Sequence, residues 1–270
     1  MSASRLDALR TVVRQYSSAL VGYSGGVDSS VVAVVVRQEL GKDDMLAVIG
    51  RSASLAGEQA GAAHRIASLF DVPTLELETN ELDDTRYLAN PINRCFFCKT
   101  ELWSKLGELA RVRGLAVVCD GTNAADLDEH RPGLLAGARA GVRSPLAEAG
   151  LSKTDVRAAA HALGLPNWDA PAAPCLSSRV QYGVEITPAR LRQVEEAEAF
   201  LRELGVRGDL RVRHHGGWAR LEVERAWIPW VLARQREVSR RLQALGFERV
   251  EVDPRGYRRG GLLADRTTGR

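Results

Sequence analysis

The feature that most constrains the fold is a short polar loop, residues 24–29 (SGGVDS), set between two apolar segments. Ahead of it, residues 18–23 (SALVGY) predict a buried strand. After it, residues 29–40 predict a helix: the segment is rich in valine, but it follows a glycine turn and continues into polar residues before Gly41. Two adjacent glycines let several backbone N–H groups point at one anion, and the helix adds its positive end. The loop therefore predicts a phosphate site.

The side chains of this loop refine the prediction. Ser24 and Ser29 can donate hydroxyl hydrogens to the same anion as Gly25 and Gly26. A carboxylate beside phosphate, here Asp28, implies a bridging Mg²⁺. The loop has neither the G-x-x-x-x-G-K-[ST] nor the G-x-G-x-x-G pattern, and it resembles the PP-loop of the ATP pyrophosphatase superfamily. A glycine turn that binds nothing is the alternative.

Strand-like and helix-like segments alternate through the first half of the chain, which is typical of a parallel sheet covered on both faces. We therefore predict an α/β fold, a Rossmann-like doubly wound parallel sheet with a smaller C-terminal α+β domain. Predicted strands are residues 18–23, 45–49, 74–78 and 115–119, and predicted helices are residues 29–40, 58–69, 98–113 and 152–163.

The pattern changes after residue 183. Here the order is helix (187–204), hairpin (210–214 and 218–224), helix (228–245) and strand (249–252). We predict a PP-loop domain with the cysteine site over 1–183, a substrate-phosphate or oligomerisation domain over 184–258, and a flexible tail over 259–270.

Composition narrows the class of function. The net charge of +3 and the 6% of aromatic residues suit an anionic small molecule better than a nucleic acid. The longest apolar run, residues 31–36, is too short to span a membrane, and no signal-peptide pattern is present, so the cytoplasm is expected. Cysteines in that compartment favour metal binding or chemistry over disulfides.

A second polar cluster, residues 120–126 (DGTNAAD), follows the fourth predicted strand. The carboxyl edge of an open α/β sheet is where ligands bind. Gly121, Thr122 and Asn123 are therefore candidates for nucleotide binding, and Asp126 for Mg²⁺. A helix N-cap loop is the alternative.

Three cysteines form the third candidate site. Cys95 and Cys98 make a C-x-x-C pair, and Cys175 stands in a proline-rich loop, PCLSSR. Zinc, redox chemistry and iron–sulfur ligation all remain open for such a pair. Three thiolates would leave one iron of a 4Fe–4S cluster without a protein ligand. Cys119 ends an apolar strand and is predicted to be a buried small residue.

Together, SGGVDS, NPINRCFFCK (90–99), DGTNAADLDEHRPG (120–133) and PCLSSR (174–179) resemble the LarE family over roughly residues 6–251. These are ATP-dependent sulfur-insertion enzymes of nickel-pincer nucleotide cofactor synthesis. The resemblance implies ATP and Mg²⁺ as cofactors, and adenylation of the carboxylates of pyridinium-3,5-biscarboxylate mononucleotide followed by their conversion to thiocarboxylates, with release of pyrophosphate and AMP. It also implies a homo-oligomer, and possible partners in an upstream carboxylase and a downstream nickel-insertion enzyme.

Two branches of that family differ in the source of sulfur. One sacrifices the cysteine of PCLSSR, which is Cys175 here, and lacks the C-x-x-C. The other holds a 4Fe–4S cluster with three cysteines, and Cys95, Cys98 and Cys175 match that pattern. The resemblance favours the cluster branch, with sacrifice of Cys175 as the alternative.

The resemblance implies further site residues. Ser178 and Arg179 would lie beside the sulfur chemistry, and Arg211 and Arg213, with Glu222, would bind the substrate phosphate. Alternate strand residues share a face, so the two arginines would form a paired anion site, unless they simply face solvent. Other possible site residues are Arg94, Trp103 and Glu198.

Three rival functions remain. A PP-loop tRNA thiolase also joins adenylation to a three-cysteine cluster, but the weak net charge and PCLSSR argue against it. An amidotransferase-type synthetase needs no cysteine triad. An AMP-binding sensor has no use for a loop that holds pyrophosphate.

Overall fold

The computed structural model describes residues 2–127, 132–171 and 174–258. Its contacts divide the chain into two compact units: unit 1 is Met1–Glu81 with Asn93–Ala173, and unit 2 is Leu82–Ile92 with Pro174–Arg270. This division falls ten residues before the boundary expected after residue 183, and the predicted tail over 259–270 lies outside the described residues.

Asn90 explains why residues 82–92 join the C-terminal part of the chain. It is fully buried, and its side-chain amide donates to the carbonyls of Val180, Gln181 and Val184 at 3.3, 2.8 and 3.0 Å. The N–H of Gly183 returns a bond to the Asn90 carbonyl at 3.0 Å. One buried amide thus fastens this excursion to the segment that follows Cys175.

Unit 1 is built on a four-stranded parallel sheet in the order β3-β2-β1-β4, which confirms the predicted α/β class. The strands are β1 Ala19–Gly22, β2 Met45–Arg51, β3 Thr74–Glu78 and β4 Val117–Cys119. The chain first moves from β1 to β2 and β3, and then returns to place β4 on the other side of β1. This reversal creates a switch point at the carboxyl ends of β1 and β4, where open α/β sheets bind ligands.

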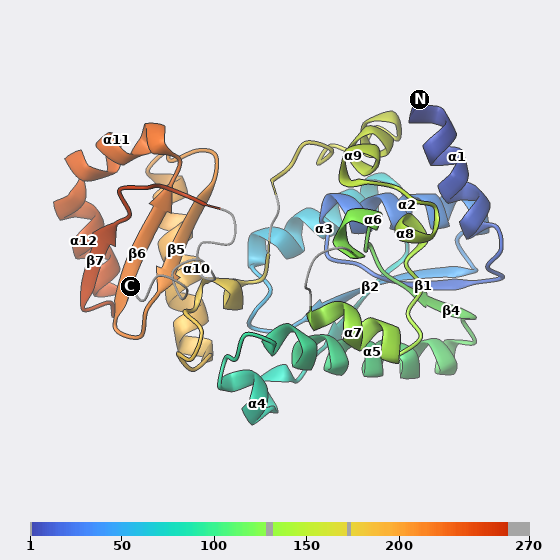
Figure 1. Cartoon of the computed structure of the whole chain (residues 1–270), viewed down its shortest axis with the longest axis horizontal. Coiled ribbons are helices and arrows are strands. Elements are labelled where there is room, and N and C mark those ends of the chain that lie inside the picture. The colour runs from blue at the N-terminus through green and yellow to red at the C-terminus, as the bar shows by residue number, and fades with distance from the viewer. Residues whose placement is uncertain (1, 128–131, 172–173, 259–270) are drawn as a thin grey trace. The chain divides into compact units, whose positions relative to one another are not determined.

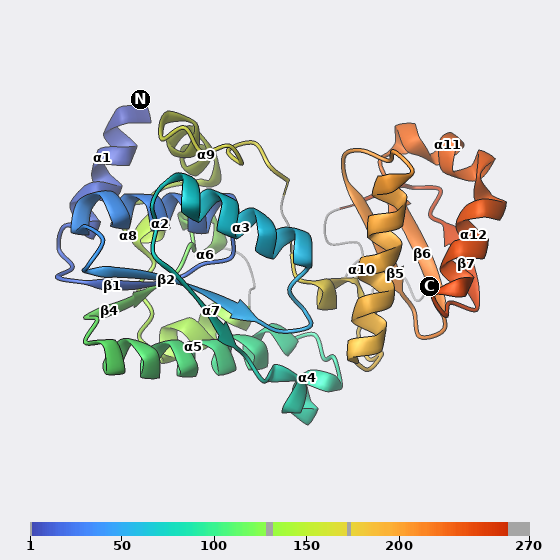
Figure 2. The same cartoon turned by 180° about the vertical axis from the view of Figure 1, so that it is seen from behind.

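Helices cover both faces of this sheet (Figures 1 and 2). On one face lie α1 Ser2–Val13, α2 Val27–Leu40, α3 Gly57–Leu69 and α9 Lys153–Ala162, and on the other lie α5 Arg94–Arg113 and α7 Pro132–Arg139. Short segments complete the unit: η1 Glu81–Asp83, α6 Ala124–Leu127 and α8 Pro145–Glu148.

The valine-rich segment is helical, as predicted, because α2 is enclosed on all sides. Residues 29–36 of α2 are all buried, between the sheet and helices α1 and α9. A helix that is apolar all round belongs in a core, so packing outweighs the weak helix propensity of valine.

Unit 2 contains a three-stranded sheet in the order β5-β6-β7. Its elements are α4 Thr85–Leu88, η2 Leu176–Arg179, α10 Pro188–Glu203, β5 Leu210–His214, β6 Trp218–Val223, η3 Arg225–Trp227, α11 Ile228–Ala233, α12 Gln235–Ala244 and β7 Arg249–Val252. Strands β5 and β6 form the predicted hairpin, whereas β7 pairs with β6 in parallel, which requires the helical crossover α11–α12. The helix predicted over 228–245 is divided at Arg234.

The core of unit 2 lies on one face of its sheet. Leu210 and Val212 of β5 pack there with residues of α10, α11 and α12. Because side chains alternate along a strand, Arg211 and Arg213 point to the other face. One face of β5 is therefore apolar and packs in the core, whereas the other face is charged.

Candidate active site

The loop after β1 has the geometry of an anion cradle. Helix α2 begins at Val27 and its N-cap is Gly26, which has no side chain to satisfy the first N–H groups of the helix. The Oγ of Ser29 donates to the Gly26 carbonyl at 3.1 Å and lies 3.1 Å from the Oγ of Ser24. Both hydroxyls thus stand at the open, positive end of a 14-residue helix.

The two glycines of the loop are required for different reasons. Gly25 has φ = +73°, and a Cβ there would come within 2.7 Å of the Cβ of Ala63 on α3. Any side chain at this position would be strained and would push the loop off α3. Gly26 has no side chain that could cap α2, so the first N–H groups of the helix are left for a ligand.

Two side chains from elsewhere in unit 1 brace this loop. The amide of Asn167 donates to the carbonyl of Gly25 at 3.0 Å, and the amide of Gln59 donates to that of Ser24 at 3.1 Å. These bonds fix the path of the loop, in which the N–H of Ser24 donates to Oγ of Ser29 at 3.2 Å and the N–H of Gly26 donates to Oγ of Ser24 at 3.4 Å. Sequence reasoning missed both residues, because a single amide in a loop or helix carries no pattern.

A second turn, after β4, meets the phosphate loop at the switch point. Gly121 lies so close that an added Cβ would be 2.7 Å from the backbone N of Ser29. Next to it, the amide of Asn123 donates to Oδ1 of Asp28 at 2.9 Å. The structure thus brings together the candidates of both clusters, with the Asp28 carboxylate held at the end of α2.

Asp126 has a local role in the same turn. Its Oδ2 accepts the N–H of Asn123 at 3.2 Å, and its own N–H donates to Oδ1 of Asn123 at 3.2 Å. This reciprocal pair caps α6, which is the alternative considered from the sequence. The Mg²⁺ role of Asp126 remains a prediction.

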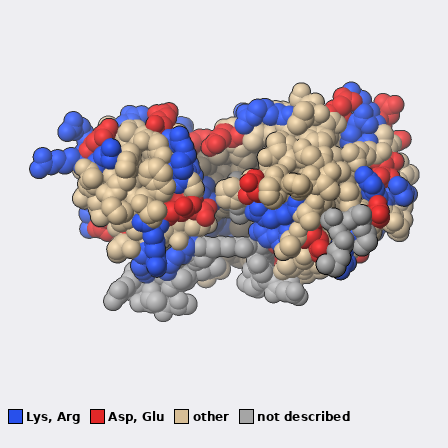
Figure 3. All heavy atoms as spheres, turned by 90° about the horizontal axis from the view of Figure 1, so that it is seen from above, with Lys and Arg blue, Asp and Glu red and all other residues tan. Residues whose placement is uncertain are grey.

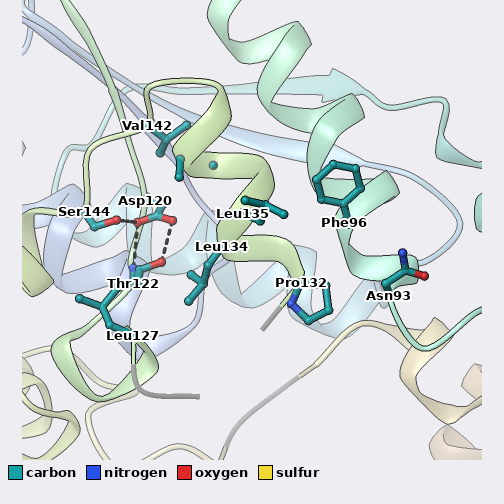
Figure 4. Close-up of a pocket in the computed structure, with 12 residues that line it drawn as sticks. Asn93, Phe96, Asp120, Thr122, Leu127, Pro132, Leu134, Leu135, Val142 and Ser144 are labelled. Atoms are coloured by element: carbon teal, nitrogen blue, oxygen red, sulfur yellow. Dashed lines mark hydrogen bonds between the residues drawn. The ribbon is translucent and has the colours of Figure 1, made fainter. Parts of the chain in front are cut away.

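A pocket of about 660 Å³ opens beside this turn (Figure 4). Its walls are largely apolar, from α5 and α7, and its polar end comes from the loops after β4 and before α8. The lining residues are Asn93, Phe96, Asp120, Thr122, Leu127, Pro132, Leu134, Leu135, Gly137, Ala138, Val142 and Ser144. It joins the first turn of the C-x-x-C helix to the turn that contacts the phosphate loop.

Asp120 organises the polar end of this pocket. Its Oδ1 accepts the hydroxyl of Ser144 at 2.8 Å and the N–H of Thr122 at 3.0 Å, and its Oδ2 accepts the Thr122 hydroxyl at 2.7 Å. Because the hydroxyls of Ser144 and Thr122 both donate their hydrogens to Asp120, their oxygens are left as hydrogen-bond acceptors at this end of the pocket. Sequence reasoning missed Ser144, although the Ser-Pro step that begins α8 is a helix-start signal.

Cys95 and Cys98 lie in the first two turns of α5. Residues three apart share a helix face, so both thiols point to the same side. Cys95 is exposed and Cys98 half-buried. Gly133 of α7 packs against this turn, and a Cβ added there would lie 3.2 Å from Cγ of Lys99 and in ordinary contact with Cys95.

The carbonyl of Cys175 is held by several donors. It accepts the N–H and the hydroxyl of Ser178, at 3.0 and 2.7 Å, and Nη1 of Arg179 at 3.0 Å. Arg179 also donates to the Pro174 carbonyl and forms a two-bond ion pair with Glu198, at 3.1 and 3.2 Å. The predicted residues Ser178 and Arg179 thus fix the loop that carries the half-buried thiol.

The arginine pair of β5 is buried, so the alternative that these side chains face solvent is wrong. Arg211 and Arg213 are each 6% exposed, and Glu222 on the paired strand is 1% exposed. The Nε of Arg213 donates to Glu222 at 2.8 Å, and Arg220 donates to the other oxygen of that carboxylate at 3.0 Å. Burial lowers the pKa of Arg211, and the nearby charge of Arg179 lowers it further. Crowding of buried guanidinium groups is the arrangement that an anionic ligand relieves.

Three other residues singled out from the sequence are buried inside the protein. Trp103 is buried in the core, where its ring occupies the space that a side chain on Gly22 would need. Cys119 is fully buried, as predicted, and burial raises the pKa of its thiol well above the usual range. His214 is buried, which lowers its pKa to about 4.

No group of three His, Cys, Asp or Glu residues suited to hold a metal ion is found within the part of the chain that the structure describes. The same part contains no helix long and apolar enough to cross a membrane. On the face drawn in Figure 3, acidic and basic side chains are interspersed over both units.

Comparison with known proteins agrees with the fold and the phosphate loop. The NAD synthase family matches residues 2–94, which contain β1, the loop and α2. An uncharacterised protein of Synechocystis is 42% identical over 97% of this chain and 98% of its own length. A pyridinium-3,5-bisthiocarboxylic acid mononucleotide synthase of Lactiplantibacillus plantarum is 36% identical over 96% of this chain and 94% of its own. An uncharacterised protein of Methanocaldococcus jannaschii is 28% identical over 88% of this chain and 90% of its own.

The parallel sheet, the uncapped helix and the SGGVDS loop define an ATP-using enzyme of the PP-loop class. Within that class, the similarity to the Lactiplantibacillus synthase extends over nearly the whole chain, including unit 2. The chain belongs to the LarE family.

Proposed function

We propose that this enzyme inserts sulfur into pyridinium-3,5-biscarboxylate mononucleotide, converting its carboxylates to thiocarboxylates for the nickel-pincer nucleotide cofactor. The observation that carries the proposal is the carboxyl edge of β1 and β4, where an open helix end meets a carboxylate held by Asn123. The named relative, which is similar over both units, supplies the substrate class.

The first step is adenylation at the phosphate loop. A substrate carboxylate oxygen attacks the α-phosphorus of ATP, and the bond to the β-phosphate oxygen breaks to release pyrophosphate. Ser24, Gly25, Gly26 and Ser29 would bind the phosphates through hydroxyl and backbone N–H groups, with Gly121, Thr122 and Asn123 beside them. Asp28 has the chemistry to hold Mg²⁺, with Asp126 as a second candidate.

The second step replaces AMP by sulfur. An oxide is a poor leaving group, whereas AMP leaves readily from an acyl-adenylate, so a sulfur nucleophile can attack the activated carbon. We assign Cys95, Cys98 and Cys175 as ligands of a 4Fe–4S cluster; thiolates are its usual ligands, and two of these lie on one helix face. Such a cluster would supply the sulfide that attacks the activated carbon.

Sacrifice of Cys175 is the alternative source of sulfur. Its thiolate would attack the acyl carbon and displace AMP to form a thioester. Loss of the Cα proton to a base and cleavage of the Cβ–S bond would then leave a thiocarboxylate and dehydroalanine. The half-buried thiol and the braced loop are compatible with this route as well.

Unit 2 would bind the phosphate of the substrate through Arg211 and Arg213, with Glu222 orienting Arg213. We propose that residues 184–258 have this role, and that residues 1–183 contain the adenylation and cysteine chemistry. The pocket lined by Phe96 and Thr122 would receive the pyridinium ring, because it lies between the C-x-x-C helix and the turn that contacts the phosphate loop. A homo-oligomer in the cytoplasm, with an upstream carboxylase and a downstream nickel-insertion enzyme as partners, completes the proposal.

The test uses anaerobically purified protein with ATP, Mg²⁺, sulfide and the pyridinium nucleotide. We expect a brown protein with about four iron per chain, and thiocarboxylate together with AMP and pyrophosphate as products. Cys175→Ala should abolish the thiocarboxylate, whereas Cys119→Ala should retain it, since Cys119 is enclosed in the core.

Mass spectrometry of the peptide containing Cys175 after turnover separates the two sulfur sources. An intact cysteine after several turnovers supports the cluster, and dehydroalanine at this position supports sacrifice. Colourless protein with tightly bound zinc would contradict the cluster, and equal loss of product in both cysteine variants would contradict the assignment of Cys175.

A further inference from the structure

Glu198 on α10 contacts both chemical features of unit 2. Both oxygens of its carboxylate accept from the arginine that holds the Cys175 loop, and one of them also accepts from the backbone of the strand that carries the arginine pair. We propose that Glu198 is a positioning residue that keeps the Cys175 thiol at a fixed place relative to Arg211 and Arg213. The inference rests on the proposed function and adds to it how the sulfur chemistry is aligned with the bound phosphate.

The first half of the linkage leads to the thiol. Glu198 accepts Nε and Nη2 of Arg179 in two parallel bonds, which fix the guanidinium plane. The remaining Nη1 of Arg179 is thereby aimed at the carbonyls of Pro174 and Cys175. Because a carbonyl and its own Cα are rigidly joined, holding the Cys175 carbonyl restricts where the thiol can go.

The second half leads to the arginine pair. Oε1 of Glu198 also accepts the N–H of Val212 at 3.0 Å, and Val212 stands between Arg211 and Arg213 on β5. Arg213 closes the circuit by donating to the carbonyl of Ser178 at 3.0 Å. The thiol loop and the arginine strand are therefore joined twice, once through Glu198 and once through Arg213.

Charge adds a second reason for a carboxylate at this position. The guanidinium groups of Arg179, Arg211 and Arg213 repel one another in a buried environment, and the Glu198 charge offsets that repulsion at Arg211. Glutamine would keep the shape of the side chain but remove the charge, so the cations would separate and the Cys175 loop would move with Arg179. Glu198 thus maintains the arrangement before the substrate phosphate arrives.

The first experiment separates the two half-reactions in the holoenzyme with saturating ATP and pyridinium nucleotide. In Glu198→Gln, pyrophosphate release should stay within about twofold of the native rate, while thiocarboxylate formation should fall about 100-fold, as for a reacting group misplaced by an ångström. Arg179→Lys should show the same split, and the double variant should lose no more than either single one. Glu196→Gln, exposed on the same helix, is the matched control and should match the native enzyme in both steps.

A second measurement does not depend on activity. In cluster-free protein, alkylation of Cys175 by iodoacetamide should become about fivefold faster in Glu198→Gln, because the loop opens more often, while alkylation of Cys95 in the same sample stays unchanged. Equal loss of both half-reactions, or an unchanged Cys175 rate, would overturn the positioning role. If the native enzyme releases pyrophosphate but makes no thiocarboxylate, the proposed function fails, and the alkylation rates still decide the positioning role.

Discussion

The two units contain two anion sites built on different physical principles. In unit 1, the phosphate loop relies on backbone N–H groups, two glycines and the end of α2, with few charged side chains. In unit 2, the strand β5 places two buried guanidinium groups on one face and balances them with Glu222 and Glu198. The first is a property of backbone shape, and the second depends on charge balance.

This difference predicts how each site fails. A backbone cradle is lost when the chain cannot adopt its path, whatever the charge of the new residue. A buried charge network is lost when one partner is removed, because the remaining charge is then left uncompensated. Variants that act on only one of these properties should therefore affect only one unit.

Gly25→Ala should have the largest effect. The methyl group would meet Ala63 and would stand at a positive φ, so the loop should shift away from the phosphates. We expect pyrophosphate release to fall about 100- to 1,000-fold, the scale of losing preorganised donors. Gly41→Ala is the control, since Gly41 also has a positive φ but lies in open space. Similar losses in both variants would mean that general backbone strain, and not the cradle, was measured.

Asp28→Asn should follow, because it keeps the loop and removes the charge that would hold Mg²⁺. Pyrophosphate release should fall about 100-fold while the cluster and its colour remain. Titration with Mg²⁺ should show a raised requirement for the ion. A colourless variant would indicate instead that the substitution disturbs folding.

Arg213→Lys should affect the other site. Lysine keeps the charge but cannot reproduce the separate bonds from Nε to Glu222 and from Nη1 to Ser178. We expect the KM for the pyridinium nucleotide to rise about 10- to 150-fold with an unchanged KM for ATP, since charge-assisted bonds contribute about 1.5–3 kcal/mol. Arg207→Lys, an exposed change next to the same strand, should leave both constants unaltered.

His214→Gln should have the smallest effect, on stability alone. Burial lowers the pKa of His214 to about 4, so the folded chain holds this ring neutral while the unfolded chain protonates it near pH 6.5. The stabilisation from the neutral ring is complete above pH 6.5 and is lost as the pH falls toward 4, up to about 3 kcal/mol. The melting temperatures of the native protein and the variant should be measured from pH 7.5 to 4, and the melting temperature of the variant should decline less. Parallel declines would contradict the lowered pKa of His214.

Prediction from sequence succeeded where a local pattern carries the information. The phosphate loop, the strand–helix alternation and the hairpin of unit 2 each have a signature within one short segment, and the structure confirms the parallel sheet and the hairpin. The short helices α6, α7 and α8 were not predicted, because each has few turns and little periodicity. Asn90 was missed for a related reason: its buried amide joins segments that are distant in the sequence, and no local pattern indicates such a contact.

The sequence by itself determined the chemistry available: a glycine loop for phosphate, three cysteines outside the apolar strands, and an alternating pair of arginines. Only the tertiary structure decided how these are held, because Asn123 reaches Asp28 across 95 residues and Glu198 reaches strand β5 from helix α10. The physical reason is that backbone conformation depends on neighbouring residues, whereas the burial and pairing of charges depend on which distant segments pack together.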